Sequence, residues 1–108
     1  MKQIGEKQID ANGVLINFEI SIKKIIEYDN CFIVLIRERK EIPNNIIAYD
    51  YYGNELWKIN DIVRAKISRG YDDIEKMSNN MLKTYYELGI VYEIDLDCMK
   101  ITNETYMR

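Results

Sequence analysis

Histidine is absent from this chain of 108 residues, which limits the chemistry that its side chains could perform. Its absence excludes Ser-His and Cys-His catalytic sites and metal sites with histidine ligands. The five glycines are scattered and form no phosphate-binding loop. Paired carboxylates could still do acid-base chemistry, and the candidates are Asp50, Asp95 and Asp97.

Asp50 and Asp95 also have a structural interpretation, because each ends an apolar run. Residues 46–59 and 90–101 both contain a strand that reaches an aspartate, turns tightly and leaves through a strand ending in Lys-Ile. A carboxylate in that place can accept hydrogen bonds from turn amides. This internal repeat favours a structural role, and we expect the chain not to be an enzyme.

Acidic clusters could offer oxygens to calcium, but their spacing matches no EF-hand loop. One cluster is Asp72 and Asp73 with Glu75, and the other is Asp95 with Asp97. We therefore expect no metal site and no cofactor.

Nine tyrosines and one tryptophan are a more informative excess, because tyrosine is favoured in strands and at protein interfaces. Strand alternation must expose at least one of Tyr49, Tyr51 and Tyr52, and the same holds for Tyr85 and Tyr86. Ordinary strand propensity and an exposed contact surface both explain this excess.

Length, composition and charge predict a single domain over residues 1–108. The net charge of −3 argues against a nucleic-acid partner, which would require a basic face. No uncharged run approaches the roughly 20 residues that cross a bilayer, and the N-terminus lacks the apolar core of a signal peptide. We expect a cytoplasmic protein with no membrane partner. Of the two cysteines, Cys31 is expected to be a small buried hydrophobe.

Alternating apolar residues predict strands in the first half of the chain. Val14 to Ile22 alternates regularly after the turn signal Asn12-Gly13, and Lys23 to Tyr28 extends this strand. Cys31 to Glu38 is apolar on both faces, which predicts a central strand. Lys40 to Asn45 contains the single proline and predicts a loop.

Two hairpins are predicted in the second half, with Trp57 as a buried anchor of the first. The first pairs Ile46 to Tyr52 with Glu55 to Ile59 around Gly53. The second pairs Met81 to Glu87 with Ile90 to Leu96, and Met99 to Thr102 could form a short last strand.

Residues 60–80, between the hairpins, are polar and have no clean period. An irregular loop and a connection with a short helix over Tyr71 to Met77 are both open alternatives, since Asp72 and Asp73 suit a helix N-terminus. The predicted fold is mainly β, with α+β as an alternative. We expect an antiparallel sheet of about six to eight strands and at most one or two short helices.

The first hairpin resembles those in blades of quinoprotein-type and related β-propellers. About a quarter of the chain carries this match, through Ala48, Tyr49, Asp50, Gly53, Leu56 and Trp57. A propeller needs about four or more four-stranded blades, so the resemblance implies a blade-like antiparallel sheet and no propeller cofactor. The chain also resembles small bacterial proteins, including presumed immunity proteins of toxin systems, that share a "D..GN.LW.I" hairpin and a later "G..Y.(I/L)D....KI" strand pair.

That second resemblance, together with the acidic balance and the tyrosines, implies a protein-binding module. The specific expectation is an immunity protein that neutralises a bacterial toxin with a basic active-site cleft. A small-molecule-binding or accessory domain, with a pocket beside residues 60–80, is the alternative. The expected partner-binding residues are Tyr71, Asp72, Asp73, Glu75, Tyr51 and Tyr52.

Overall fold

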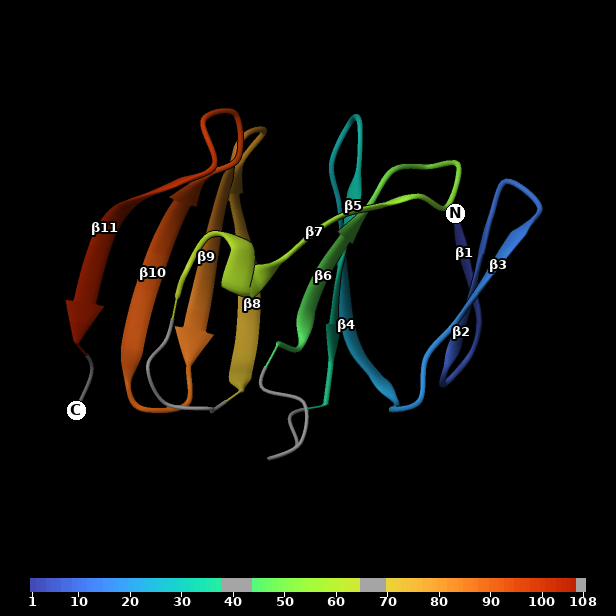
Figure 1. Cartoon of the computed structure of the whole chain (residues 1–108), viewed down its shortest axis with the longest axis horizontal. Helices are drawn as coiled ribbons and strands as arrows, with labels where there is room; N and C mark the ends of the chain where they lie inside the picture. Colours follow the sequence, from blue (N-terminus) through green and yellow to red (C-terminus); the bar gives the residue numbers. More distant parts are fainter. Residues whose placement is uncertain (38–43, 65–69, 107–108) are drawn as a thin grey trace.

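The computed structural model describes residues 1–37, 44–64 and 70–106, which form a mainly β protein (Figure 1). These residues contain eleven strands and one short 3-10 turn, arranged in three antiparallel sheets. The predicted class and the antiparallel pairing are confirmed. The predicted strand number was too low, because short polar strands at the N-terminus and a strand within residues 60–80 had given no periodic signal.

The N-terminal sheet is a three-stranded meander in the order β1-β2-β3. Its strands are β1 (Lys2–Gly5), β2 (Gln8–Ala11) and β3 (Val14–Asn17). The single strand predicted from Val14 to Tyr28 is wrong, because the chain leaves this sheet after Asn17. The Phe18 amide donates to the Lys7 carbonyl at 2.8 Å, and Ile22 opens the next sheet.

The middle sheet has the order β4-β5-β6-β7. Its strands are β4 (Ile22–Glu27), β5 (Phe32–Ile36), β6 (Ile46–Tyr49) and β7 (Glu55–Lys58). Every residue of β5 and β6 is buried, which confirms the predicted central strand. The first predicted hairpin is confirmed as β6 and β7. In the predicted loop, residues 40–43 lie outside the described residues.

The C-terminal sheet has the order β11-β10-β9-β8. Its strands are β8 (Tyr71–Ser78), β9 (Met81–Tyr86), β10 (Ile90–Asp95) and β11 (Lys100–Tyr106), and the 3-10 turn η1 (Ile59–Asp61) precedes them. Residues 71–78 are therefore a strand, and neither a helix nor a loop describes them. The predicted β9–β10 hairpin is confirmed, and the last strand is longer than expected.

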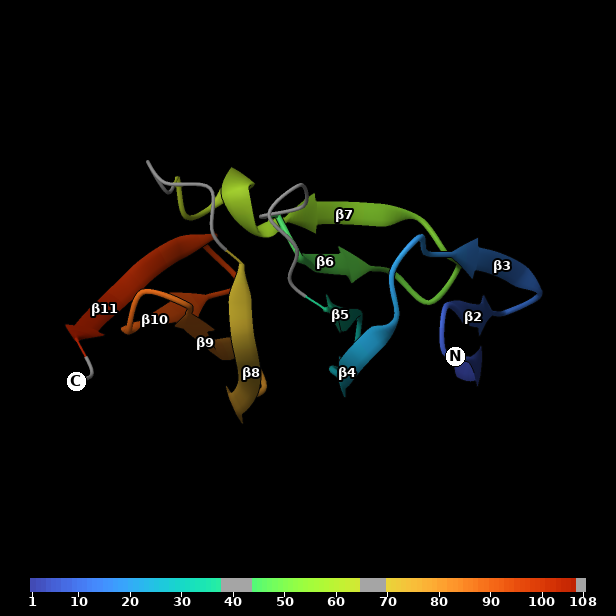
Figure 2. The same cartoon turned by 90° about the horizontal axis from the view of Figure 1, so that it is seen from below.

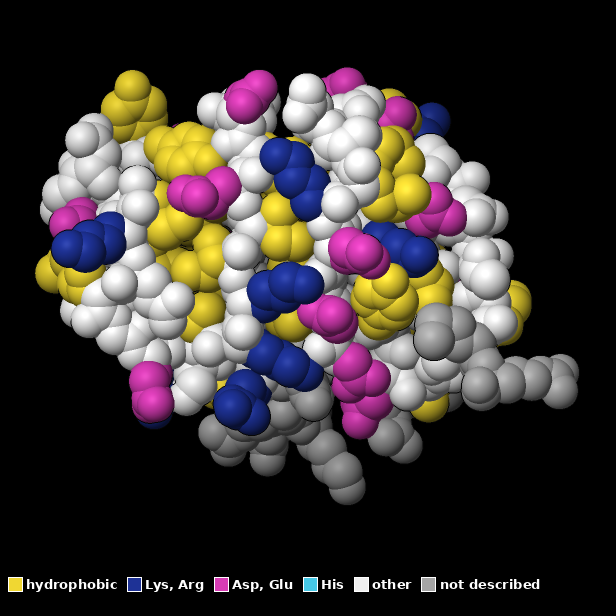
Figure 3. All heavy atoms as spheres, turned by 180° about the vertical axis from the view of Figure 1, so that it is seen from behind, with side chains coloured by type: hydrophobic (Ala, Val, Ile, Leu, Met, Phe, Trp, Pro, Cys, Tyr) yellow, Lys and Arg dark blue, Asp and Glu magenta, His cyan; other side chains and the backbone are white. Residues whose placement is uncertain are grey.

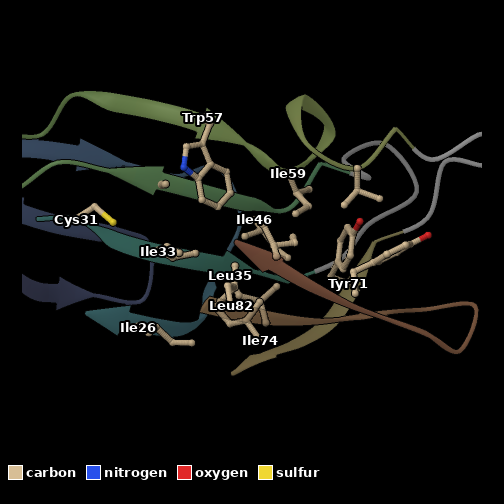
Figure 4. Packing of buried hydrophobic residues seen from close by; sticks show 14 of the residues in the cluster. Ile26, Cys31, Ile33, Leu35, Ile46, Trp57, Ile59, Tyr71, Ile74 and Leu82 are labelled. Atoms are coloured by element: carbon tan, nitrogen blue, oxygen red, sulfur yellow. The ribbon is translucent and has the colours of Figure 1, made fainter. Parts of the chain in front are cut away.

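The two four-stranded sheets face each other as the two sides of a wedge. Figure 2 shows their first strands, β4 and β8, close together, while β7 and β11 lie far apart. Apolar side chains from both sheets and from η1 fill the space between them, as Figure 4 shows for Trp57, Ile59 and Ile74. Trp57 is 8% exposed, so its predicted burial is confirmed.

The N-terminal sheet covers the other face of the middle sheet. Ile9 and Ala11 of β2 pack with Phe32 and Tyr49, whose rings stack with centroids 5.6 Å apart. The middle sheet is thus buried on both faces. The outer face of the C-terminal sheet has no such covering layer among the described residues.

Lysines fill the seam where β4 and β8 run side by side. The Lys24 ammonium donates to the Ile74 carbonyl at 2.6 Å, and the Lys76 ammonium donates to the Glu27 carbonyl at 3.1 Å. Each strand therefore satisfies carbonyls on the other through side chains. An unpaired strand edge that carries lysine resists direct strand pairing, so the two sheets stay separate.

Buried Asn45 makes a second link between these sheets. Its amide nitrogen donates to the carbonyls of Ile36 and Tyr71, at 2.9 and 3.0 Å, and its amide oxygen accepts from the Tyr71 backbone at 2.8 Å. Because a buried amide is costly unless it is hydrogen-bonded, these three bonds fix the start of β8 against the end of β5.

Candidate functional site

The candidate site is the uncovered outer face of the C-terminal sheet. Tyr71 and Ile74 of β8 point into the core, whereas Asp73 and Glu75 are exposed. The register pairs Asp73 with Tyr85 and Glu75 with Lys83, so acidic residues stand directly beside an aromatic ring and a lysine. Figure 3 shows acidic and basic side chains interleaved across this side of the molecule.

A bulge in β8 places one more carboxylate at this face. The register passes from Tyr71 opposite Tyr86 to Asp73 opposite Tyr85, which leaves Asp72 as an extra residue. Regular alternation would send Asp72 and Asp73 to opposite faces of the sheet. With the bulge, both residues line the same hollow.

This hollow has a volume of about 260 Å³ and lies beside Tyr85. Tyr85, Ile90 and Val91 supply apolar surface, and the carboxyl-bearing residues around it are Asp72, Asp73 and Glu87. We call it the acidic hollow. A second hollow of about 270 Å³ is lined by Lys83, Tyr85, Val91, Glu93 and Thr105, so it shares Tyr85 and Val91 with the first. We call it the mixed hollow, because it carries one charge of each sign.

Contacts within the chain hold some of these carboxylates in place. Asp73 accepts from the Lys24 ammonium at 3.1 Å, across the seam. Glu75 accepts from the Tyr85 hydroxyl at 2.8 Å, and this hydrogen bond raises the pKa of Tyr85 above its ordinary value. The hydrogen bond from the Tyr85 hydroxyl to Glu75 orients the Tyr85 ring beside the acidic hollow.

The aspartates that the sequence repeat singled out are held by turns. Asp50 accepts from the amides of Tyr52 and Asn54 at 2.9 and 3.0 Å, and the Asn54 amide contributes most to lowering the Asp50 pKa. Asp95 accepts from the amides of Asp97 and Cys98, and the Cys98 amide contributes most to lowering its pKa. The structural interpretation of Asp50 and Asp95 is confirmed.

A third copy of this device was missed in the sequence. Asp10 accepts from the Gly13 amide at 2.8 Å, in the turn between β2 and β3. Each of the three sheets therefore has an aspartate that accepts from an amide of the turn before its last strand. The signal was the order Asp-Ala-Asn-Gly at residues 10–13, but the residues before it are mostly polar and do not predict a strand.

A family model described as "Domain of unknown function (DUF7957)" matches residues 2–106. The chain belongs to this family. The matched residues begin with β1 and end with β11, so the family unit comprises all three sheets. No curated protein and no solved structure matches the chain.

Not all of the residues expected to bind a partner lie together in this DUF7957 chain. Asp72, Asp73 and Glu75 are exposed, and Asp72 and Asp73 line the acidic hollow. Tyr71 is fully buried, with its ring 5.1 Å from that of Tyr86, so including it in the contact surface was wrong. Its place in a polar connection had suggested exposure, but this part of the connection is a strand, and Tyr71 points into the core.

Tyr51 and Tyr52 lie in the turn between β6 and β7, next to the N-terminal sheet and away from β8 (Figure 1). The Tyr51 hydroxyl donates to the Tyr28 carbonyl and its ring packs near Phe32, so Tyr51 supports the core. Tyr52 is 68% exposed. The tyrosine that does lie beside the acidic residues is Tyr85. From the sequence we expected only that at least one of Tyr85 and Tyr86 is exposed.

The described residues contain no group of three or more side chains arranged to hold a metal ion. Among them, no helix is both long and apolar enough to cross a membrane. A further hollow of about 220 Å³ lies between the turn ends of the two facing sheets, and its lining includes Cys31, Trp57 and Asp97. Burial raises the pKa of the Cys31 thiol, which keeps that thiol in its neutral, less reactive form.

Proposed function

We propose that this chain is a non-catalytic protein-binding module that recognises a partner through the outer face of its C-terminal sheet. The observation that carries the proposal is the acidic hollow, where the β8 bulge brings Asp72 and Asp73 together beside Tyr85. Tyrosine and complementary charge are typical of protein interfaces, and a site on paired strands is largely preformed.

The specific form of the proposal is a cytoplasmic immunity protein whose partner is a bacterial toxin with a basic active-site cleft. An acidic face can fill such a cleft and speed the encounter by electrostatic steering. The net charge of −3 supports a basic protein partner over nucleic acid or an anionic membrane surface.

Co-expression with the product of the reading frame immediately upstream tests this function. Immunity predicts that the chain restores growth to cells that produce the toxin and that the two proteins purify as a complex. If the cells are not protected and no complex forms, the immunity function is wrong.

The association rate tests the face itself. Replacing Asp72→Lys and Asp73→Lys together should slow association by about tenfold or more at low salt, and the defect should shrink as salt rises. The exposed Lys24–Asp73 pair would be lost, which costs less than about 1 kcal/mol, so the variant should fold.

The matched control replaces Glu6→Lys and Glu19→Lys, two exposed residues outside the C-terminal sheet. Both double variants change the net charge by the same amount. If only the overall charge matters, the two double variants should associate with the partner equally slowly. That result would contradict recognition by this face.

Small-molecule binding is the second candidate, favoured by the hollow between the facing sheets. Its volume of about 220 Å³ lies below the roughly 300–1,000 Å³ of most ligand pockets, so it suits only a small ligand. A ligand-induced, concentration-dependent rise in the unfolding midpoint would support this function.

A further inference from the structure

The two hollows beside Tyr85 share a wall but differ in charge. Both include Tyr85 and Val91 in their lining, and their volumes are nearly equal. The acidic hollow adds three carboxyl-bearing residues, whereas the mixed hollow adds Lys83 and Glu93. The Lys83 ammonium lies 5.6 Å from the centre of the Tyr85 ring, so a cation already lies near the ring.

A side chain that enters the acidic hollow must suit an apolar wall and an anionic rim together. A purely apolar side chain would strip water from the carboxylates without replacing its hydrogen bonds, which is costly. An acidic side chain would be repelled. Lysine and arginine combine an aliphatic stem with a cationic end, so they fit both parts.

Arginine fits better than lysine because of its flat and weakly hydrated guanidinium group. That group stacks on aromatic rings and binds carboxylates through two parallel hydrogen bonds. The acidic hollow offers the Tyr85 ring and, through the β8 bulge, two consecutive aspartates. Two lysines of β4 approach this rim across the seam: Lys24 donates to the Asp73 carboxylate and Lys23 donates to the Asp72 carbonyl.

We propose that the acidic hollow receives an arginine side chain of the partner protein, with its stem against Val91, its guanidinium on Tyr85 and its charge on Asp72 and Asp73. This inference rests on the proposed protein-binding function and names the chemistry of its anchor.

The test is an NMR titration of the full chain with short peptides that differ at one residue. The arginine peptide should shift the backbone signals of Gly89 and Val91, which line the acidic hollow. The same peptide with citrulline, a neutral analogue of arginine, should leave these signals in place. The lysine peptide should bind more weakly than the arginine peptide, because it cannot stack or form paired hydrogen bonds.

Substitutions assign the binding to one hollow. Replacing Asp72→Asn and Asp73→Asn together should weaken arginine-peptide binding by about fivefold or more. Replacing Glu93→Gln in the mixed hollow should leave binding unchanged. Unshifted signals from the middle and N-terminal sheets confirm that each variant is folded.

Equal binding of the citrulline peptide, equal binding of the lysine peptide, or an unchanged affinity of the double asparagine variant would each overturn the arginine site. If the arginine peptide fails while the toxin still binds through this face, only the arginine site is wrong. If the peptide binds but no toxin complex forms, the arginine site stands and the immunity function is wrong.

Discussion

Trp57 and Leu56 are neighbours in β7 with opposite surroundings. Trp57 is 8% exposed in the core between the facing sheets, whereas Leu56 is 51% exposed. Replacing Trp57→Ala should lower the free energy of unfolding by about 3–5 kcal/mol, because it removes buried surface and leaves a cavity. Replacing Leu56→Ala should change it by about 0.5 kcal/mol. Urea denaturation of both variants measures the difference, and equal losses would contradict the burial of Trp57.

Three aspartates have a structural role, because each accepts at least one hydrogen bond from an amide of a turn. Asp10, Asp50 and Asp95 all accept turn amides, at the same place in three sheets. Asp72 and Asp73 lie at a bulge within β8 and away from its turn, and the bulge decides their direction. All five residues are aspartates. The local backbone decides whether the carboxylate stabilises a turn or is exposed for recognition.

At the scale of elements, β4 and β8 are neighbouring strand edges that lysines keep apart. Lys24→Met and Lys76→Met each keep most of the side-chain stem but remove the ammonium that reaches the other strand. Each should lower the free energy of unfolding by about 1 kcal/mol, the usual worth of a hydrogen bond. Urea denaturation measures the change.

Lys83→Met is the control for these two variants. Its ammonium lies near the Tyr85 ring of its own strand, β9, and Lys83 does not belong to either strand of the seam. It should change the free energy of unfolding by about 0.5 kcal/mol or less. Losses for Lys24 and Lys76 no larger than this would show that the lysines do not join the sheets.

The sequence predicted the elements that have a clear period and a local turn. The hairpins around Gly53 and Gly89 and the buried run from Phe32 to Ile36 were visible because their partners are close in sequence or their faces are fully apolar. β8 was not visible, since only Tyr71 and Ile74 of its eight residues are buried and two register shifts interrupt its alternation.

The site was predictable only in part for the same reason. Composition indicated acidic residues and tyrosines, and Asp72, Asp73 and Glu75 are exposed. Their partner Tyr85 comes from β9, and the register that joins them follows from the β8 bulge. The bulge directly follows Tyr71, whose backbone is hydrogen-bonded to Asn45, and a single sequence does not display such a tertiary contact.

At the scale of the whole molecule, the turn between β6 and β7 of the middle sheet packs against the N-terminal sheet. Gly53 has a φ of +88°, and a Cβ added there would lie 2.8 Å from Cγ1 of Val14. Gly13 has the same φ of +88° but open space around it. Gly13→Ala should therefore lower the free energy of unfolding by about 1–2 kcal/mol, from backbone strain alone. Gly53→Ala should cost the same strain and about 1–3 kcal/mol more, because its methyl group clashes with Val14.

The additional substitution Val14→Ala separates these two contributions. In the Gly53→Ala background it should recover part of the lost free energy of unfolding, because it removes the clashing methyl groups. In the Gly13→Ala background the same change should give no recovery. If Gly53→Ala and Gly13→Ala are equally destabilising and Val14→Ala rescues neither, the N-terminal sheet does not rest on this turn in solution. Rescue confined to Gly53 would establish that the N-terminal and middle sheets pack as one unit.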